Sequence, residues 1–154
     1  MGRWDRSPAR TAPATELDRL SSAERPLVLF DGVCGLCNWW VDFVLRRDRK
    51  AVFKFAPLQS VTGQAILSRH GLPTDDLTTI VLVRGARIDR YSTAALEILR
   101  RLGGVWSMLY VFVLVPPPVR DMVYEFVAAR RFRWFGQLDA CPVPAPEEQA
   151  RFLE

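Results

Sequence analysis

Two cysteines three residues apart, Cys34 and Cys37, are the side chains whose spacing points most clearly to chemistry. They follow an apolar run, Leu27 to Phe30, that is typical of a short strand buried on both faces. After Cys37, apolar residues recur at spacings of three and four, which is the period of a helix. The pair therefore stands where a strand passes into a helix, at the sheet edge that favours ligand and reaction sites.

Cysteines at such a junction suit thiol-disulfide exchange. The free amide groups and positive dipole end of a helix stabilise a thiolate, so we expect Cys34 to be the nucleophile. Cys37, one turn further along, can reach back and resolve a mixed disulfide. Gly35 adds no side chain that would shield Cys34, and we take it as a candidate substrate-contacting residue. This setting of a C-x-x-C pair is that of thioredoxin-like redox motifs.

Three other interpretations of these residues stay open. A C-x-x-C pair is also half of a zinc site, but the remaining donors, Cys141 and the single histidine, His70, lie far along the chain. We therefore expect no metal and no other cofactor. The two cysteines can instead simply pack in a core. A phosphatase-like role for Asp31 needs a second acid two residues later, where Val33 stands.

The composition is that of one ordinary soluble domain. The chain has 154 residues, of which 49% are hydrophobic and 25% charged, enough to bury a core. A net charge of +4 without a recognised binding motif does not favour a nucleic-acid partner. Residues 1–25 are rich in Arg, Ala, Ser, Pro and Thr, and we predict a disordered tail there without the apolar stretch of a secretory signal. We expect a cytoplasmic protein, in which structural disulfides would be rare.

Strand and helix signals alternate over residues 26–104. Ser60 or Thr62 is expected to cap a second helix, and Ser92 or Thr93 to open a third that stops at Gly103. The predicted order is β-α-β-α-β-β-α, a thioredoxin-like α/β domain with one antiparallel hairpin. The strands expected after the first are Val52 to Pro57, Thr79 to Val83 and Arg87 to Tyr91.

Residues 105–154 are predicted to form a helical C-terminal extension packed on the same domain. The run from Val105 to Val115 holds one polar residue, Ser107, and is too short to span a bilayer. We expect this run to pack in the core rather than to face a partner or a membrane surface. A further helix is predicted from Pro118 to Arg131.

The sequence resembles the DCC family of predicted thiol-disulfide oxidoreductases, named after an Asp-x-x-Cys-x-x-Cys signature that stands here as Asp31, Cys34 and Cys37. The resemblance implies a thioredoxin-like fold and disulfide exchange with a thiol- or disulfide-containing protein or small molecule. It extends from Leu27 to Leu153, and its matching blocks include Phe55 to Ser60, Ser92 to Gly104, Leu114 to Tyr124 and Arg131 to Cys141.

The signature implies a role for Asp31, either as a base that takes a proton from Cys37 or as a residue that holds the turn. Thioredoxins carry a cis-proline just before the third strand, where Thr79 stands here, so a standard substrate groove is not expected. The Thr79 hydroxyl is a candidate to approach a sulfur. Pro57, Thr79 and Trp134 complete the candidate substrate contacts, and Cys141 is either a third thiol or a packed residue.

A function of a different class is the alternative. In it the chain is a non-catalytic binding or adaptor module, and the run over residues 105–115 docks a partner or a membrane face. The cysteines would then serve as a metal or redox-sensing clip.

Overall fold

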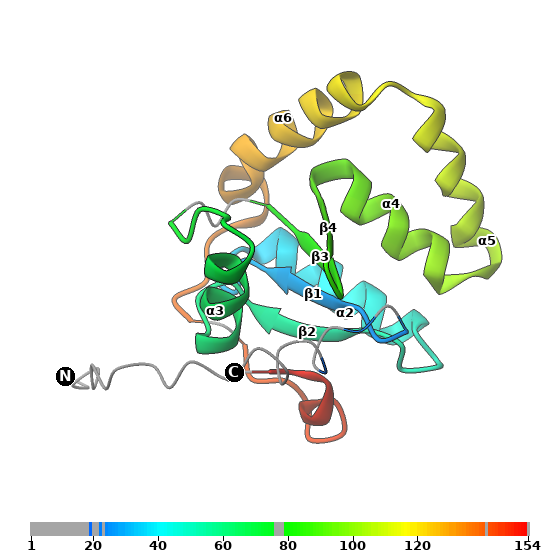
Figure 1. Cartoon of the computed structure of the whole chain (residues 1–154). Helices are drawn as coiled ribbons and strands as arrows, with labels where there is room; N and C mark the ends of the chain where they lie inside the picture. Colours follow the sequence, from blue (N-terminus) through cyan, green and yellow to red (C-terminus); the bar gives the residue numbers. More distant parts are fainter. Residues whose placement is uncertain (1–18, 20–21, 23, 76–78, 141, 154) are drawn as a thin grey trace.

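The computed structural model describes residues 19, 22, 24–75, 79–140 and 142–153. Most of the predicted tail over residues 1–25 lies outside this range, as does Cys141. The domain is built on a four-stranded sheet in the order β2-β1-β3-β4 (Figure 1). Strand β1 pairs in parallel with β2 and antiparallel with β3, and β3 pairs antiparallel with β4. The strands are β1 (Leu27–Phe30), β2 (Lys54–Pro57), β3 (Val81–Arg84) and β4 (Arg87–Arg90).

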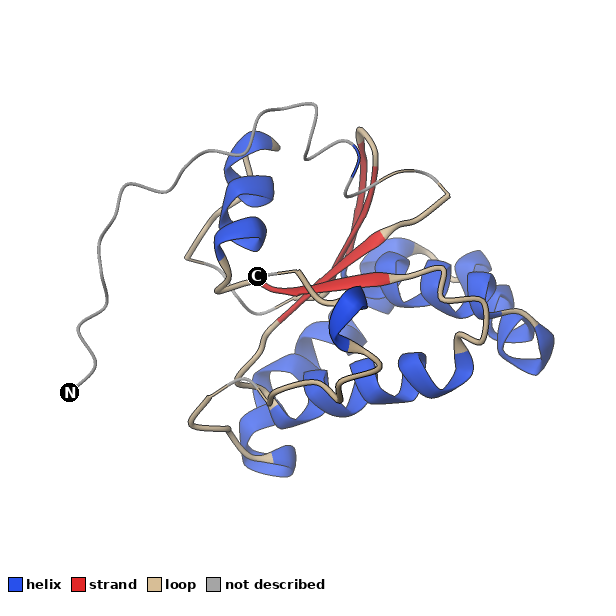
Figure 2. Cartoon of the chain, turned by 90° about the horizontal axis from the view of Figure 1, so that it is seen from below, coloured by secondary structure: helices blue, strands red, loops and turns tan. Residues whose placement is uncertain are grey.

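Helices cover both faces of this sheet and bury its side chains in two clusters. On one face α2 (Gly35–Arg47) and α4 (Tyr91–Leu102) pack on Val28, Phe30 and Leu82. On the other face α3 (Val61–Arg69) packs on Leu27, Leu29 and their neighbours, and stands apart from the remaining helices in Figure 2. The order of elements is β-α-β-α-β-β-α, and the fold is thioredoxin-like, as predicted.

Two strands are shorter at their start than the sequence indicates, because side chains take the backbone amides there. The N–H groups of Val52 and Phe53 donate to the carboxylate of Asp48, so β2 begins only at Lys54. The Ile80 N–H donates to the Tyr124 hydroxyl at 2.9 Å, so β3 begins at Val81. A local side chain, Asp48, therefore replaces the start of one predicted ladder, and a distant one, Tyr124, replaces the start of the other.

Of the two helix starts for which the sequence predicts a capping or opening side chain, one is confirmed and one is wrong. Ser60 caps α3, and its hydroxyl accepts from the Gly63 N–H at 3.0 Å. The expected start of α4 at Ser92 or Thr93 is wrong, because α4 begins at Tyr91. The Ser92 hydroxyl and N–H bond instead to Asp121, which holds α4 against a later helix.

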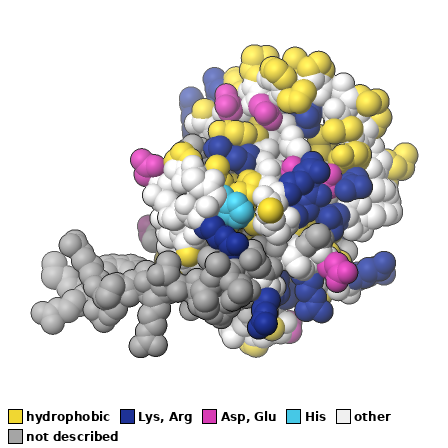
Figure 3. Space-filling view, in the orientation of Figure 1, with side chains coloured by type: hydrophobic (Ala, Val, Ile, Leu, Met, Phe, Trp, Pro, Cys, Tyr) yellow, Lys and Arg dark blue, Asp and Glu magenta, His cyan; other side chains and the backbone are white. Residues whose placement is uncertain are grey.

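The C-terminal part is helical but differs from the prediction in its packing. A short helix α5 (Gly104–Ser107) leads into a 3₁₀ helix η1 (Met108–Leu114), and then into α6 (Pro117–Phe135). The expectation that the run over 105–115 packs in the core is wrong, since Met108 is 71% and Leu114 81% exposed. Hydrophobic side chains gather at this end of the molecule in Figure 3. Helix α6 runs four residues past the predicted end and contacts both α2 and α4. The predicted boundary between residues 104 and 105 stays a prediction.

Candidate active site at the Cys34–Cys37 pair

Cys34 lies at the junction of β1 and α2 that the sequence predicts. It is the N-cap residue of α2, in an extended conformation with φ −87° and ψ 121°. Its sulfur accepts a hydrogen bond from the Cys37 N–H at 3.3 Å, the position that a serine or aspartate oxygen takes in other helix caps. One of the backbone N–H groups that a helix N-terminus leaves without a partner therefore donates to the Cys34 sulfur.

The pKa values of the two thiols are shifted in opposite directions. The pKa of Cys34 is lowered to about 6, chiefly by the hydrogen bond from the Cys37 side chain, with the Cys37 N–H and the charge of Arg131 contributing further. Burial and the Asp31 charge oppose that shift. The pKa of Cys37 is raised, because its thiol is hydrogen-bonded to the Cys34 side chain and is itself buried. Near neutral pH the pair thus holds a thiolate at Cys34 and a proton at Cys37.

A segment that follows α6 covers Cys34. Residue Gln137 forms an isolated antiparallel bridge with Cys34, and the Leu138 N–H donates to the Val33 carbonyl at 2.7 Å. The Gly35 N–H donates to the Gly136 carbonyl at 3.2 Å. Cys34 consequently has no exposed surface, and Cys37 is only 7% exposed. We call residues 136–138 the cover segment.

A glycine at position 35 is required by the close approach of the end of α6 rather than by an open cleft. A Cβ atom added at Gly35 would lie 2.3 Å from the Phe135 carbonyl oxygen, closer than any real contact allows. The last turn of α6 therefore rests directly on the first residue of α2. The reason for a glycine between the cysteines is this close backbone approach.

Asp31 is buried and holds the turn before Cys34. Its Oδ1 accepts from the Val33 N–H at 3.1 Å and from Gln59 Nε2 at 2.7 Å. Its Oδ2 forms an ion pair of 3.0 Å with Arg131, whose side chain is only 5% exposed. Gln59 also accepts from the Gly32 N–H at 3.1 Å, so one amide side chain braces both residues of the turn.

Three side chains that hold this loop are absent from the predicted site residues: Asn38, Gln59 and Arg131. Asn38 Nδ2 donates to the carbonyls of Gly32 and Cys34, both at 2.8 Å. A carboxylate directly after a buried strand does indicate that hydrogen-bond donors or a cation must lie next to it, because a buried charge is costly without such partners. The chain has 21 lysines and arginines, however, so residue type alone does not identify Arg131.

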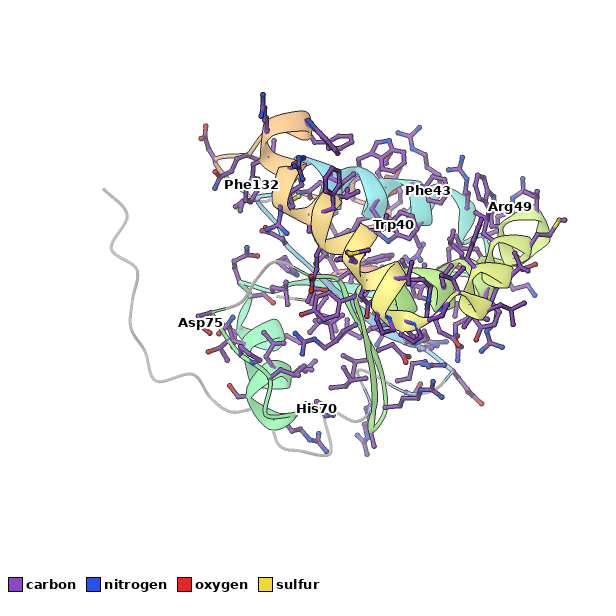
Figure 4. All side chains as sticks on the ribbon, turned by 90° about the horizontal axis from the view of Figure 1, so that it is seen from above. Trp40, Phe43, Arg49, His70, Asp75 and Phe132 are labelled. Carbon is purple, nitrogen blue, oxygen red and sulfur yellow. The ribbon has the colours of Figure 1, made fainter. Side chains whose placement is uncertain are left out.

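The remaining residues that the sequence analysis considers lie in different parts of the fold. Pro57 pairs with Phe30 at the sheet edge next to the cysteine loop. The Thr79 hydroxyl donates to the Ile80 carbonyl at 3.2 Å and accepts from the Tyr91 N–H at 3.3 Å. Trp134 is 53% exposed and meets Phe126 edge-on. His70 ends α3 on the opposite side of the molecule from Trp40 in Figure 4, so it is remote from the pair.

Within the described residues, no cluster of three or more His, Cys, Asp or Glu is placed to hold a metal ion. Across the same residues, no helix is both long and apolar enough to cross a membrane.

Comparison with known proteins agrees with the geometry. A family model described as DCC1-like thiol-disulfide oxidoreductase matches residues 28–137. The chain is 45% identical over 127 residues to the uncharacterized protein YuxK of Bacillus subtilis, covering 82% of this chain and 93% of that protein. It is 41% identical over 119 residues to a DCC family protein of Arabidopsis thaliana named as chloroplastic, covering 77% of this chain and 69% of that protein. No solved structure matches the chain.

Proposed function

The chain belongs to the DCC1-like thiol-disulfide oxidoreductase family, and we propose that it catalyses thiol-disulfide exchange through Cys34 and Cys37. The observation that carries this proposal is the place of Cys34 at the N-cap of α2, where its sulfur accepts a hydrogen bond from the Cys37 N–H at 3.3 Å. The pKa of Cys34 is lowered to about 6 and that of Cys37 is raised, which is the division that a nucleophile and a resolving thiol require.

The proposed reaction with a substrate disulfide has two displacements. The Cys34 thiolate attacks one substrate sulfur, a mixed disulfide forms at Cys34, and the other substrate sulfur leaves as a thiolate that takes up a proton. Cys37 then gives up its proton and attacks the Cys34 sulfur. The Cys34–Cys37 disulfide forms and the second substrate thiolate is released, so two electrons pass to the substrate.

Two features of the site shape this reaction. Cys34 is fully buried, so a substrate disulfide reaches it only after the cover segment moves away. Asp31 has its carboxylate committed to Val33, Gln59 and Arg131, which supports a positioning role at the turn over that of a base. The substrate would be a thiol- or disulfide-containing protein or small molecule. We place the reaction in the cytoplasm, where thiols are kept reduced.

A second candidate function has one observation in its favour. The exposed apolar side chains of η1, Met108 and Leu114 among them, suit a binding or adaptor module that docks a partner. The metal-clip form of this alternative lacks support among the described residues, where no third donor joins the pair.

The reduction potential of the pair tests the proposed function. Purified protein is equilibrated in glutathione buffers and its free thiols are trapped. We expect a reversible two-electron transition between about −270 and −120 mV, the range of known exchange proteins. Cys37→Ser is the control, since it cannot form the intramolecular disulfide. If the parent chain forms no Cys34–Cys37 disulfide in any buffer, the exchange function is wrong and the adaptor alternative takes its place.

A further inference from the structure

Cys37 opens onto a groove that the exchange mechanism above does not use. The groove has a volume of about 240 Å³ and lies between α2, α4 and α6. Figure 4 shows Trp40, one of its lining residues, beside α6. Cys37 lines this groove and Cys34 does not, so a molecule bound there meets Cys37 first. The apolar lining includes Leu36, Trp40, Ala95, Val123, Val127 and Ala128.

The polar groups of the groove recognise no charged ligand. Arg131 lines it, but its charge is already paired with Asp31 at 3.0 Å. The Tyr124 hydroxyl accepts from the Ile80 N–H, and burial raises its pKa, so it stays neutral. The Trp40 indole N–H is buried and has no hydrogen-bond partner among the described residues. A ligand that fits these walls is uncharged and largely apolar, with an acceptor atom for the Trp40 indole N–H.

The groove also adjoins the exposed apolar surface. Ala95, Val123 and Tyr124 line both it and a second hollow of about 470 Å³, whose other walls include Phe112 and Val119. Phe112 is 52% and Val119 47% exposed, so the second hollow leads outward through apolar side chains. The groove lined by Cys37 thus shares apolar walls with a hollow at the exposed apolar surface.

We propose that this groove binds a small, uncharged, apolar thiol, which reduces the oxidised Cys34–Cys37 pair by attack at Cys37. The proposal rests on the proposed function and names the reductant that recycles the pair. A substrate disulfide and the reductant would then use opposite sides of the pair: the cover segment guards Cys34, whereas the groove leads to Cys37.

The recycling step balances in two displacements. The thiol loses its proton to solvent, and its sulfur bonds to the Cys37 sulfur while the Cys34–Cys37 bond breaks. The electron pair of that bond stays on Cys34, the better leaving group because its thiolate is stabilised by the Cys37 N–H and Arg131. A second thiol attacks the ligand sulfur of the mixed disulfide, and Cys37 leaves and takes up that thiol's proton. Two thiols become one disulfide, and the pair gains two electrons.

The test compares two thiols as reductants of the oxidised protein. Benzyl mercaptan is small and uncharged apart from its thiol, whereas glutathione is charged, and each rate is corrected for the fraction of thiolate. We expect the corrected rate to be at least about tenfold higher for benzyl mercaptan, because its ring leaves water on binding. Acid quenching followed by peptide mapping is expected to place the transient mixed disulfide on Cys37.

Matched variants connect the preference with the groove. Ala128→Leu fills the groove from α6, and we expect it to lower the ratio of the two rates about tenfold. Ala129→Leu, at the exposed neighbouring position outside the groove lining, is expected to keep the ratio. Ala95→Leu fills the groove from α4 and replaces Ala128→Leu if that variant fails to fold.

The failures are distinguishable. If the disulfide forms but the two corrected rates are equal, the groove proposal is overturned and the exchange function stands. A mixed disulfide found on Cys34, or a preference that survives both groove variants, also overturns the groove proposal alone. If no Cys34–Cys37 disulfide forms in the parent chain, both proposals are wrong.

Discussion

The strand that leads into the cysteine loop and the 3₁₀ helix η1 are both apolar, yet they are buried to opposite extents. Every residue of β1 is at most 1% exposed, whereas Met108 and Leu114 at the ends of η1 are 71% and 81% exposed. Helices lie on both faces of β1, while η1 contacts mainly α4 and α5 on one side. Burial therefore follows from what packs across from an element, and Cys34 directly follows the strand that is covered on both faces.

The largest effect is expected from removing the charge that α6 brings to this packed region. Arg131→Met leaves the buried Asp31 carboxylate without its cation, which is expected to lower the free energy of unfolding by about 3–5 kcal/mol. Urea denaturation measures this loss. Arg130→Met is the control, with an expected loss below about 1 kcal/mol, because the Arg130 guanidinium stacks on Phe126 and donates a long, exposed hydrogen bond to the Phe126 carbonyl but pairs with no buried carboxylate among the described residues.

A double variant separates the ion pair from the packing of the arginine stem. Asp31→Asn combined with Arg131→Met is expected to recover most of the lost stability, because the carboxylate charge is removed as well. If the free energy of unfolding of Arg131→Met lies within about 1 kcal/mol of that of the parent chain, the ion pair does not anchor α6 to the cysteine loop.

An intermediate effect is expected in the titration of the two thiols. The pKa of Cys34 is lowered to about 6, so the thiolate is present above that pH and falls about tenfold for each further unit below it. The pKa of Cys37 is raised, so Cys37 keeps its proton across the neutral range. The ultraviolet absorbance of thiolates measures both. Cys34→Ser is expected to abolish the transition near pH 6, and a single transition near the pKa of a free thiol would contradict the asymmetry.

The smallest effect is expected on the exposed surface. Leu114→Ala removes a side chain that is 81% exposed, so the free energy of unfolding is expected to change by less than about 0.5 kcal/mol. Thermal or urea denaturation measures the change, with Leu29→Ala in the buried strand β1 as the destabilised counterpart. A large loss at Leu114 would mean that η1 is buried in the protein as it exists in solution.

Local pattern was enough to predict the architecture and the position of the reactive pair. Four consecutive apolar residues, a C-x-x-C pair and a helical period specify β1, the junction and α2 without reference to the rest of the chain. Ser60 likewise caps α3 through a bond to Gly63 three residues away. The strand starts at Val52 and Thr79 were predicted less well, because side chains took nearby backbone amides. Asp48, four residues away, accepts from the Val52 N–H, and Tyr124, 44 residues away, accepts from the Ile80 N–H.

The order of strands and helices and the place of Cys34 at a helix start were therefore predictable, since both depend on residues close along the chain. The folded chain was needed to find that Arg131 neutralises Asp31 across 100 residues, that residues 136–138 cover Cys34, and that Cys37 faces an apolar groove. It was also needed to find that the run over 105–115 is exposed. These features depend on which elements meet in space, and apolar or charged residue types alone do not specify their partners.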